Sequence, residues 1–320
     1  QAIWKQMLHN IQERTQAYGS GYSNWLQLMC DFSGDFYEIA ISGKGSKKKI
    51  KELNENYIPN KLIAGSTKKS NIPLMEGRFN ENETLIYICV DGACQLPESE
   101  IKNALEQLKI NSLFAVIGGS VGGGLAWELA VLRPNLIEHL IPVAADWKST
   151  DWLIANCHIQ EQLLNNSSQP LVYARMHAMS LYRTPESFKA KFDRILQKDQ
   201  DIFAVESWLN HHGKVLNERF QLAAYKMMNH VLKTIDITNG RGSFVEVASQ
   251  IKSNIHIITI NSDLFFKAKE NWDTYVDLKP HKDNIYISEI QSIHGHDAFL
   301  IEYDQVQAIL ETVFKPQEVY

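Results

Sequence analysis

The chain has 320 residues, of which 44% are hydrophobic and 22% are charged, and its formal net charge is −5. This composition argues against a disordered chain and against the basic surface of a nucleic-acid-binding protein, and no apolar stretch reaches the roughly 18 residues of a membrane span. We therefore expect a folded cytoplasmic protein that takes small molecules and has neither a nucleic-acid nor a membrane partner.

The cysteines and histidines give no sign of a metal site. Cys89 and Cys94 are too far apart for a CxxC redox pair or a metal knuckle, and the 11 histidines form no HExxH pattern. We predict that Cys30, Cys89, Cys94 and Cys157 are all reduced thiols, and that no metal is bound.

The first third of the chain predicts a small mixed α/β segment. Apolar residues at helical spacing indicate helices, and short runs of β-branched and aromatic residues indicate strands. The expected helices are 3–15, 22–32, 47–57 and 97–108, the expected strands are 36–41, 61–64 and 84–90, and the polar stretch 65–83 is an expected loop.

The remaining two thirds alternate strand and helix around a long helical block. The run 113–117 is unbroken and apolar, which is typical of a strand buried on both faces. Such alternation, interrupted at about 147–235, predicts a parallel sheet with a helical lid. The expected strands are 113–117, 136–144, 254–260 and 284–290, and the expected helices are 124–132, 187–196, 203–212, 217–233, 267–276 and 303–314.

Residues 118–122 fit the pattern G-x-S-x-G, with a predicted strand before them and a predicted helix after them, as a nucleophile elbow requires. The serine of such a turn has strained dihedral angles, and we expect a side chain two residues to either side to clash. Ser120 would then stand at a helix N-terminus, where the Val121 N–H can meet a developing oxyanion. A phosphate-binding turn is the alternative, although the lysine of a P-loop is absent.

A nucleophilic serine needs an acid and a base, which follow it in that order in this kind of sheet. Asp263 comes directly after a predicted strand, and His294 and His296 lie in the loop after the next strand. By spacing alone, the two histidines compete equally for the role of base, and Asp263 could instead be a helix N-cap.

From about residue 110 to 315 the chain resembles homoserine O-acetyltransferase, an α/β-hydrolase enzyme of methionine biosynthesis. The segments that carry the resemblance are FAVIGGS (114–120), ARM (174–176), YRTPESF (182–188), FAVESWL (203–209), NSDLFF (261–266) and GHDAFL (295–300). Two departures are Val121, where the family commonly has Leu or Met, and Lys267, where it usually has Pro.

The resemblance implies specific roles. It makes Ser120 the nucleophile, Asp263 the triad acid and His296 the base. It also implies ping-pong transfer from acetyl-CoA, as co-substrate, to L-homoserine, without metal or cofactor, in a homodimer formed through the helical lid. Arg175, Tyr182 and Asp297 match the family positions that hold the homoserine carboxylate and amino group; one cation and one anion suit a zwitterion.

Residues 1–108 resemble something else, namely the C-terminal end of thioredoxin-domain proteins that continue into an (α/α)6 toroid. The matching segments are GDFYEIAI (34–41), YIPN (57–60), PLMEGR (73–78) and CVDGACQLP (89–97). We therefore expect two parts, 1–108 and 109–320, the second a truncated α/β-hydrolase sheet. The family segment that donates the second oxyanion N–H would be missing, which would impair catalysis.

Two other interpretations remain open at this point. The acyl group or acceptor could differ, giving a succinyl or serine acyltransferase or a generic serine hydrolase. The chain could also be a catalytically dead fusion that keeps only the contacts of its helical lid.

Overall fold

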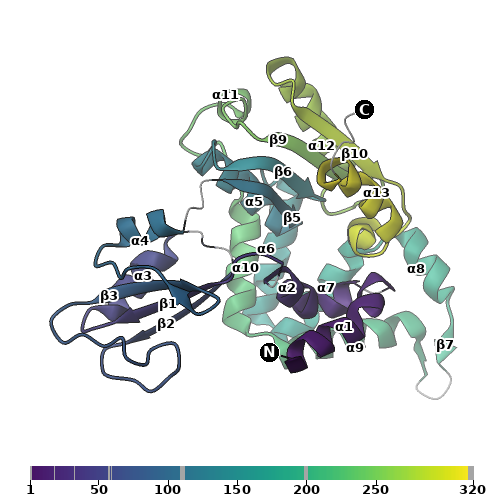
Figure 1. Cartoon of the computed structure of the whole chain (residues 1–320). Helices are drawn as coiled ribbons and strands as arrows, with labels where there is room; N and C mark the ends of the chain where they lie inside the picture. The colour runs from purple at the N-terminus through teal and green to yellow at the C-terminus, as the bar shows by residue number, and fades with distance from the viewer. Residues whose placement is uncertain are drawn as a thin grey trace. The chain divides into compact units, whose positions relative to one another are not determined.

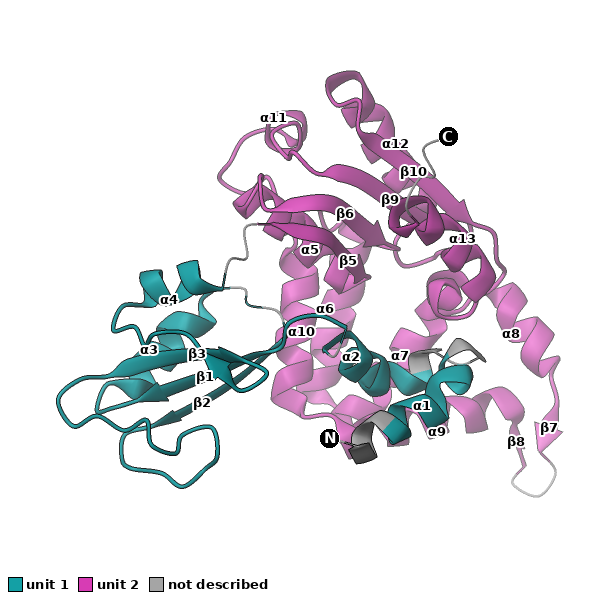
Figure 2. Ribbon diagram, in the orientation of Figure 1, with its two compact units in different colours: residues 1–111 teal, residues 112–320 magenta. Residues whose placement is uncertain are grey.

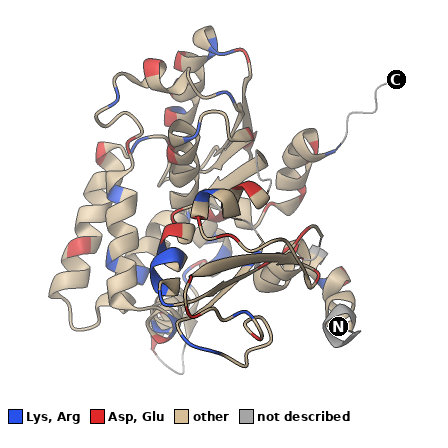
Figure 3. Cartoon of the chain, turned by 60° about the vertical axis from the view of Figure 1, so that its left-hand side comes forward, with Lys and Arg blue, Asp and Glu red and all other residues tan. Residues whose placement is uncertain are grey.

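The computed structural model describes residues 2–17, 19–31, 33–56, 58, 60–108, 112–197 and 201–315. The chain forms two compact units, residues 1–111 and residues 112–320 (Figure 2). Acidic and basic residues are interspersed along both units (Figure 3). Within the described residues, no helix is both long and apolar enough to cross a membrane.

The first unit is built around a sheet with strand order β2-β1-β3-β4 (Figure 1). Strand β1 runs parallel to β2 and antiparallel to β3. Ile39, Ile41, Ile86 and Ile88 are fully buried against the helices that follow these strands. The elements are α1 (Ala2–Ala17), η1 (Gly19–Tyr22), α2 (Ser23–Asp31), β1 (Tyr37–Ser42), α3 (Ser46–Asn54), β2 (Lys61–Ser66), β3 (Leu85–Val90), β4 (Ala93–Cys94) and α4 (Ile101–Gln107).

Helix α4 begins later than the predicted residue 97. The backbone N–H and C=O of Glu98 both bond to Ile86 of β3, so this residue extends the sheet and does not form a first helical turn. The strand predicted at 84–90 pairs with β1 and β4 and therefore belongs to the sheet of the first unit.

The prediction of four reduced thiols is wrong for two of them, because Cys89 and Cys94 form a disulfide. The turn between β3 and β4 consists of Asp91 and Gly92, both with positive φ, and it sets the two cysteines opposite each other. Asp-Gly is the usual sequence of such a two-residue hairpin turn, so the signal was present in the chain. Cys30 and Cys157 are free.

The second unit contains a parallel sheet with strand order β10-β9-β6-β5, in agreement with the predicted fold class. One core cluster joins the strands to α5, α11 and α12, and another joins them to α13, so helices cover both faces. The elements are β5 (Leu113–Gly119), α5 (Val121–Leu132), β6 (Ile137–Val143), α11 (Phe244–Ala248), β9 (Asn254–Ile260), α12 (Ala268–Leu278), η2 (Lys279–His281), β10 (Ile285–Ile290), η3 (Gly295–Leu300) and α13 (Tyr303–Phe314).

The helical lid lies between β6 and β9 in the sequence. It differs from the prediction in three places: the helix predicted at 187–196 ends at Phe192, a short hairpin precedes α9, and the predicted helix 217–233 is split. Phe220 and Gln221 have extended backbone angles, which end α9 and start α10 in a new direction. The elements are α6 (Asp151–Asn166), α7 (Pro170–Tyr182), α8 (Pro185–Phe192), β7 (Leu196–Gln197), β8 (Ile202–Phe203), α9 (Ala204–Arg219) and α10 (Leu222–Thr234).

Candidate active site

Ser120 occupies the sharp turn between β5 and α5. Its φ of 56° and ψ of −127° are strained for a residue with a side chain, as in a nucleophile elbow. A Cβ at Gly118 would lie 2.2 Å from the carbonyl oxygen of Gly122, so glycine is required at 118. The same expectation for Gly122 is wrong, because a Cβ there would meet nothing within 4 Å.

His296 lies between Ser120 and Asp263. Its Nε2 is 2.9 Å from the Ser120 Oγ, and its Nδ1 is 2.7 Å from the Asp263 Oδ2. The imidazole and the carboxylate are both buried, whereas Ser120 is partly exposed. The three predicted residues are therefore in the order that lets a serine hydroxyl pass its proton to an imidazole oriented by a carboxylate.

The carboxylate of Asp263 is held by its own loop. Its Oδ1 accepts hydrogen bonds from the backbone N–H groups of Phe265 (2.7 Å) and Phe266 (2.9 Å), leaving Oδ2 for His296. The whole residue is 1% exposed. Asp263 is not a helix N-cap, because the N-cap of α12 is Lys267; one carboxylate serves the loop N–H groups and the imidazole.

The structure also separates the two candidate histidines. The Nδ1 of His294 contacts the Ser187 Oγ at 2.9 Å, so His294 faces the lid and not the nucleophile. The adjacent Thr184 hydroxyl donates to the carbonyl of Ile293, which ties the start of α8 to the histidine loop. Gly295 has φ of 69°, and a Cβ there would lie 2.9 Å from the carbonyl oxygen of Tyr182.

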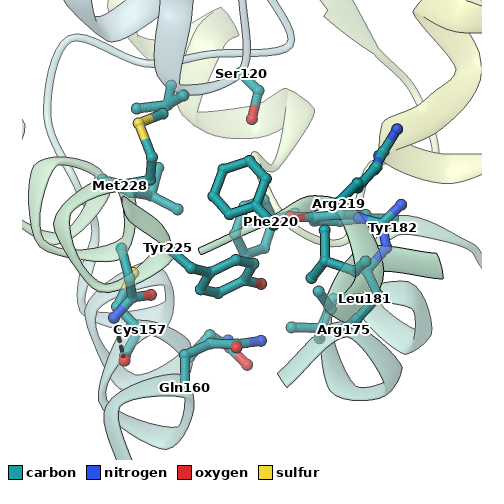
Figure 4. Close-up of a pocket in the computed structure, with 17 residues that line it drawn as sticks. Ser120, Cys157, Gln160, Arg175, Leu181, Tyr182, Arg219, Phe220, Tyr225 and Met228 are labelled. Atoms are coloured by element: carbon teal, nitrogen blue, oxygen red, sulfur yellow. Dashed lines mark hydrogen bonds between the residues drawn. The ribbon is translucent and has the colours of Figure 1, made fainter. Parts of the chain in front are cut away.

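A cavity of about 280 Å³ opens beside Ser120 (Figure 4). Ser120 lies at one end and Gln160 at the opposite end, with Phe220 and Tyr225 between them. Most of the wall is apolar. The lining residues are Ser120, Val121, Asn156, Cys157, Gln160, Arg175, Ala178, Leu181, Tyr182, Leu216, Arg219, Phe220, Tyr225, Met228, Asn229, Leu232 and Phe265.

The charges of the cavity wall are all positive. Arg175 and Arg219 line it, and no carboxylate is found among the described lining residues. The guanidinium of Arg175 lies 5.7 Å from the ring centre of Tyr182, and burial raises the pKa of this tyrosine, with Arg175 acting in the opposite direction. The wall therefore offers cations and a neutral phenol to an anionic group.

Asp297 is placed differently from Arg175 and Tyr182. Its Oδ2 lies 2.9 Å from the Nε of Arg183, and it is not one of the residues that line the cavity. Both side chains are mostly buried. The structure thus brings Arg175 and Tyr182 to the nucleophile's cavity and leaves Asp297 in an ion pair beside it, so its role in binding an amino group stays a prediction.

Several wall residues carry no motif and escape the sequence analysis, among them Gln160, Arg219 and Tyr225. They lie on lid helices whose residue patterns are ordinary, so only packing shows which side faces the cavity.

Cys157 is a nearby thiol, but burial, followed by Glu161, raises its pKa to about 11. At neutral pH it is therefore protonated and does not compete with Ser120 as a nucleophile.

Val121 is the first residue of α5 and also lines the cavity. The N–H groups of a first helical turn have no partner within their helix, and they carry the positive end of its dipole. The backbone of Val121 is therefore suited to hydrogen-bond an oxyanion formed at Ser120.

Among the described residues, no group of three or more His, Cys, Asp or Glu side chains could hold a metal ion.

The parallel sheet, the strained elbow and the Ser–His–Asp arrangement define an α/β-hydrolase-type fold. The chain is similar to homoserine O-acetyltransferases: it is 33% identical to that of Trichormus variabilis over 212 residues, covering 62% of this chain and 58% of the relative. It is also 33% identical to that of Cyclobacterium marinum over 230 residues, covering 67% and 64%. The chain thus spans about three fifths of these curated relatives' length, and no protein-family model matches it.

Solved structures agree on the fold. The homoserine O-acetyltransferase of Bacillus anthracis superposes with a TM-score of 0.56 at 19% identity, over 67% of this chain and 63% of that one. Esterase E22 superposes with a TM-score of 0.57 at 18% identity, over 66% and 64%. Transferases and esterases therefore share this architecture, and the fold alone does not separate transfer from hydrolysis.

Proposed function

We propose that the chain transfers the acetyl group of acetyl-CoA to the hydroxyl of L-homoserine, a step of methionine biosynthesis, through a covalent intermediate on Ser120. The observation that carries the proposal is the Ser120–His296–Asp263 chain of contacts at one end of a cavity that also contains Arg175. The similarity to homoserine O-acetyltransferases supports the choice of acceptor.

In the first half-reaction, the Ser120 Oγ attacks the thioester carbonyl carbon while His296 Nε2 takes the hydroxyl proton. Asp263 stabilises the imidazolium, because its Oδ2 faces Nδ1. The tetrahedral oxyanion is met by the Val121 N–H at the start of α5. Collapse expels the thiolate of CoA, which takes the proton from His296, and leaves an acetyl ester on Ser120.

In the second half-reaction, the homoserine hydroxyl takes the place of CoA. His296 removes the proton of this hydroxyl, whose oxygen attacks the carbonyl carbon of the acetyl ester. The tetrahedral intermediate then collapses, and the departing Ser120 oxygen takes the proton back from His296. Arg175 holds the carboxylate of the amino acid through charge-assisted hydrogen bonds, next to the neutral phenol of Tyr182. The apolar part of the wall disfavours water, which would otherwise hydrolyse the intermediate.

The decisive experiment follows CoA release with a thiol reagent. We expect a burst of CoA with acetyl-CoA alone, steady release only after L-homoserine is added, and O-acetylhomoserine by mass spectrometry. Ser120→Ala should abolish all three signals. Steady release without homoserine would indicate a hydrolase, faster turnover with succinyl-CoA or serine would change the substrates, and no burst in the native chain would indicate a dead protein.

A further inference from the structure

The disulfide between Cys89 and Cys94 lies in the first unit and has no part in the proposed acyl transfer. We propose that it is a thiol–disulfide exchange site for small thiols, in which Cys94 is the sulfur that they reach and Arg78 is the cation that stabilises the Cys94 thiolate. The proposal stands on the placement of Arg78, on the unequal exposure of the two sulfurs and on the way the hairpin is closed.

Arg78 is fixed beside the disulfide by contacts of its own. Its Nη2 lies 3.0 Å from the Cys94 Sγ, and its Nη1 donates to the carbonyl of Leu74 at 2.6 Å. Its guanidinium also lies 5.6 Å from the ring centre of Tyr87. Because these two anchors do not involve the sulfur, the positive charge stays in place when the disulfide opens.

The two sulfurs differ in access. Cys89 is 1% exposed, whereas Cys94 is exposed on the short strand β4. An incoming thiolate can approach Cys94 from solvent but cannot approach Cys89. Exchange therefore begins at Cys94, and the buried Cys89 is the leaving group and later the resolving thiol.

The hairpin does not depend on the disulfide for its closure. Val90 pairs with Ala93 across the Asp-Gly turn, and the N–H of Gln95 donates to the carbonyl of Ile88 at 2.9 Å. A disulfide stabilises chiefly by closing a loop in the unfolded chain, and this loop is short and already closed by backbone bonds. Opening the bond therefore leaves the local fold intact, as a reversible site requires.

The exchange balances with two small thiols. A thiolate attacks the Cys94 sulfur, forming a mixed disulfide and releasing the Cys89 thiolate, which is protonated by solvent. A second thiolate attacks the sulfur of the small molecule in this mixed disulfide, giving a small-molecule disulfide and the Cys94 thiolate beside Arg78. Two electrons pass from the two thiols to the protein, and the reverse sequence restores the Cys89–Cys94 bond.

Three ionisable groups bear on the reactivity of Cys94. Arg78 favours its thiolate, whereas Asp91, in the turn between the two cysteines, has the opposite charge and disfavours it. The ring of Tyr87 lies under the guanidinium of Arg78. Arg78 is the group in direct contact with the sulfur, so its effect on the thiolate is expected to dominate.

The test uses the full chain equilibrated with mixtures of reduced and oxidised glutathione and then alkylated for mass spectrometry. We expect the Cys89–Cys94 pair to interconvert between dithiol and disulfide, and Cys89→Ser to trap glutathione on Cys94. In Cys94→Ser, the buried Cys89 should react at least about tenfold more slowly. Cys30, an exposed free thiol of the same chain, is the internal control.

The role of Arg78 is tested by the pH dependence of alkylation of reduced Cys94. Arg78→Met should raise the midpoint pH for Cys94 alkylation by about one pH unit or more, the usual effect of losing an adjacent cation. Arg78→Lys should bring this midpoint most of the way back to the native value. The alkylation midpoint of Cys30 should be the same in all three proteins. Three results would each overturn the proposal. They are equal alkylation midpoints in the native chain and in Arg78→Met, a disulfide that glutathione does not open while the chain stays folded, and protein purified without reductant that lacks the Cys89–Cys94 disulfide.

Discussion

The Oδ2 of Asp263 lies 2.7 Å from the Nδ1 of His296, while the Oδ1 of the same carboxylate accepts two backbone hydrogen bonds. One side chain therefore anchors its own loop with one oxygen and orients the imidazole with the other. These two functions can be separated, because they fall on different atoms of the residue.

Asp263→Asn is predicted to keep the fold and lose catalysis. The amide oxygen can still accept from the backbone of Phe265 and Phe266, but its NH2 would face Nδ1 and favour the wrong imidazole tautomer. We expect acyl transfer to fall by about 10³–10⁴-fold. The rate of the CoA burst measures this, and an unchanged thermal midpoint shows that the loop is intact.

Asp263→Ala is the matched comparison, since it also removes the backbone acceptor. We expect it to lower the free energy of unfolding by about 1–3 kcal/mol, because two buried N–H groups lose their partner. If Asp263→Asn retained the native burst rate, the orienting role of this carboxylate would be refuted.

Arg175→Met is predicted to weaken binding of homoserine without changing the first half-reaction. The side chain would hold the carboxylate of the acceptor, and losing a charge-assisted hydrogen bond costs about 1.5–3 kcal/mol, or about 10- to 100-fold in KM. The burst with acetyl-CoA alone should be unchanged. Arg219→Met is the control within the same cavity wall. Because this arginine is exposed, we expect a smaller increase in the KM for homoserine than Arg175→Met gives.

Asp297→Asn completes this series and decides where the amino group binds. If Asp297 holds the ammonium, the variant should have a higher KM for homoserine. Its KM for 4-hydroxybutyrate, which lacks the amino group, should change little. If the residue serves only the ion pair with Arg183, the two acceptors should respond alike and the thermal midpoint should fall. The first outcome would retain the prediction, and the second would remove it.

The sequence predicts the triad because each member sits where a strand ends. Ser120 is marked by its glycine pattern, and Asp263 follows a strand that the structure has with the same bounds as predicted, Asn254–Ile260. The choice between His294 and His296 rested on resemblance alone. Spacing could not make it, because the contact that occupies His294 comes from Ser187, which is distant in sequence.

Other features required three-dimensional packing or were overlooked. The break between α9 and α10 falls at Phe220 and Gln221, where neither glycine nor proline signals an end. The disulfide, in contrast, was signalled by the Asp-Gly turn, which fixes the register of β3 and β4. Cysteine spacing by itself was the wrong criterion, because two residues five apart can be direct neighbours across a hairpin.

Gly118 and Gly122 form a matched pair for testing the elbow. Gly118→Ala would place its Cβ 2.2 Å from the carbonyl of Gly122, whereas Gly122→Ala meets open space. We expect Gly118→Ala to destabilise the chain by at least about 1–3 kcal/mol, as overpacking does, and Gly122→Ala to be neutral or stabilising by up to about 1 kcal/mol, because alanine favours helices. Urea unfolding measures both, and equal effects would contradict the asymmetry.

Asp146 is predicted to make stability depend on pH. The pKa of Asp146 is raised to about 7, above all by burial and also by Glu270 and Asp273, while hydrogen bonds from the Trp147 N–H and the Thr274 hydroxyl act to lower it. The folded state therefore prefers the protonated acid, whereas the unfolded chain ionises near pH 4. The stability contributed by this group is present below about pH 4 and is lost as pH rises through about 7.

The corresponding variant is Asp146→Asn, which can still accept the Trp147 hydrogen bond but cannot ionise. The free energy of unfolding is measured at pH 5 and at pH 8. Between these two pH values it should fall more in the native chain than in the variant, so that the variant is the more stable of the two at pH 8. A native chain whose stability changes no more than that of the variant over this interval would show that Asp146 does not ionise in the folded state as inferred.

The last prediction concerns the rate of the whole reaction. Tetrahedral oxyanions in such sites are held by two N–H donors, and the elbow provides one, Val121. The second donor of this fold comes from a loop before the nucleophile strand, whereas the residues before β5 in this chain form the separate sheet of the first unit. The Trichormus variabilis relative, 33% identical to the chain, serves as the reference enzyme. Loss of one donor lowers kcat by about 10²–10³-fold, so we expect turnover slower by that factor than in this relative assayed alongside. Steady turnover at an ordinary rate of about 1–10³ s⁻¹, abolished by Ser120→Ala, would contradict this prediction and show that the chain has a complete oxyanion hole.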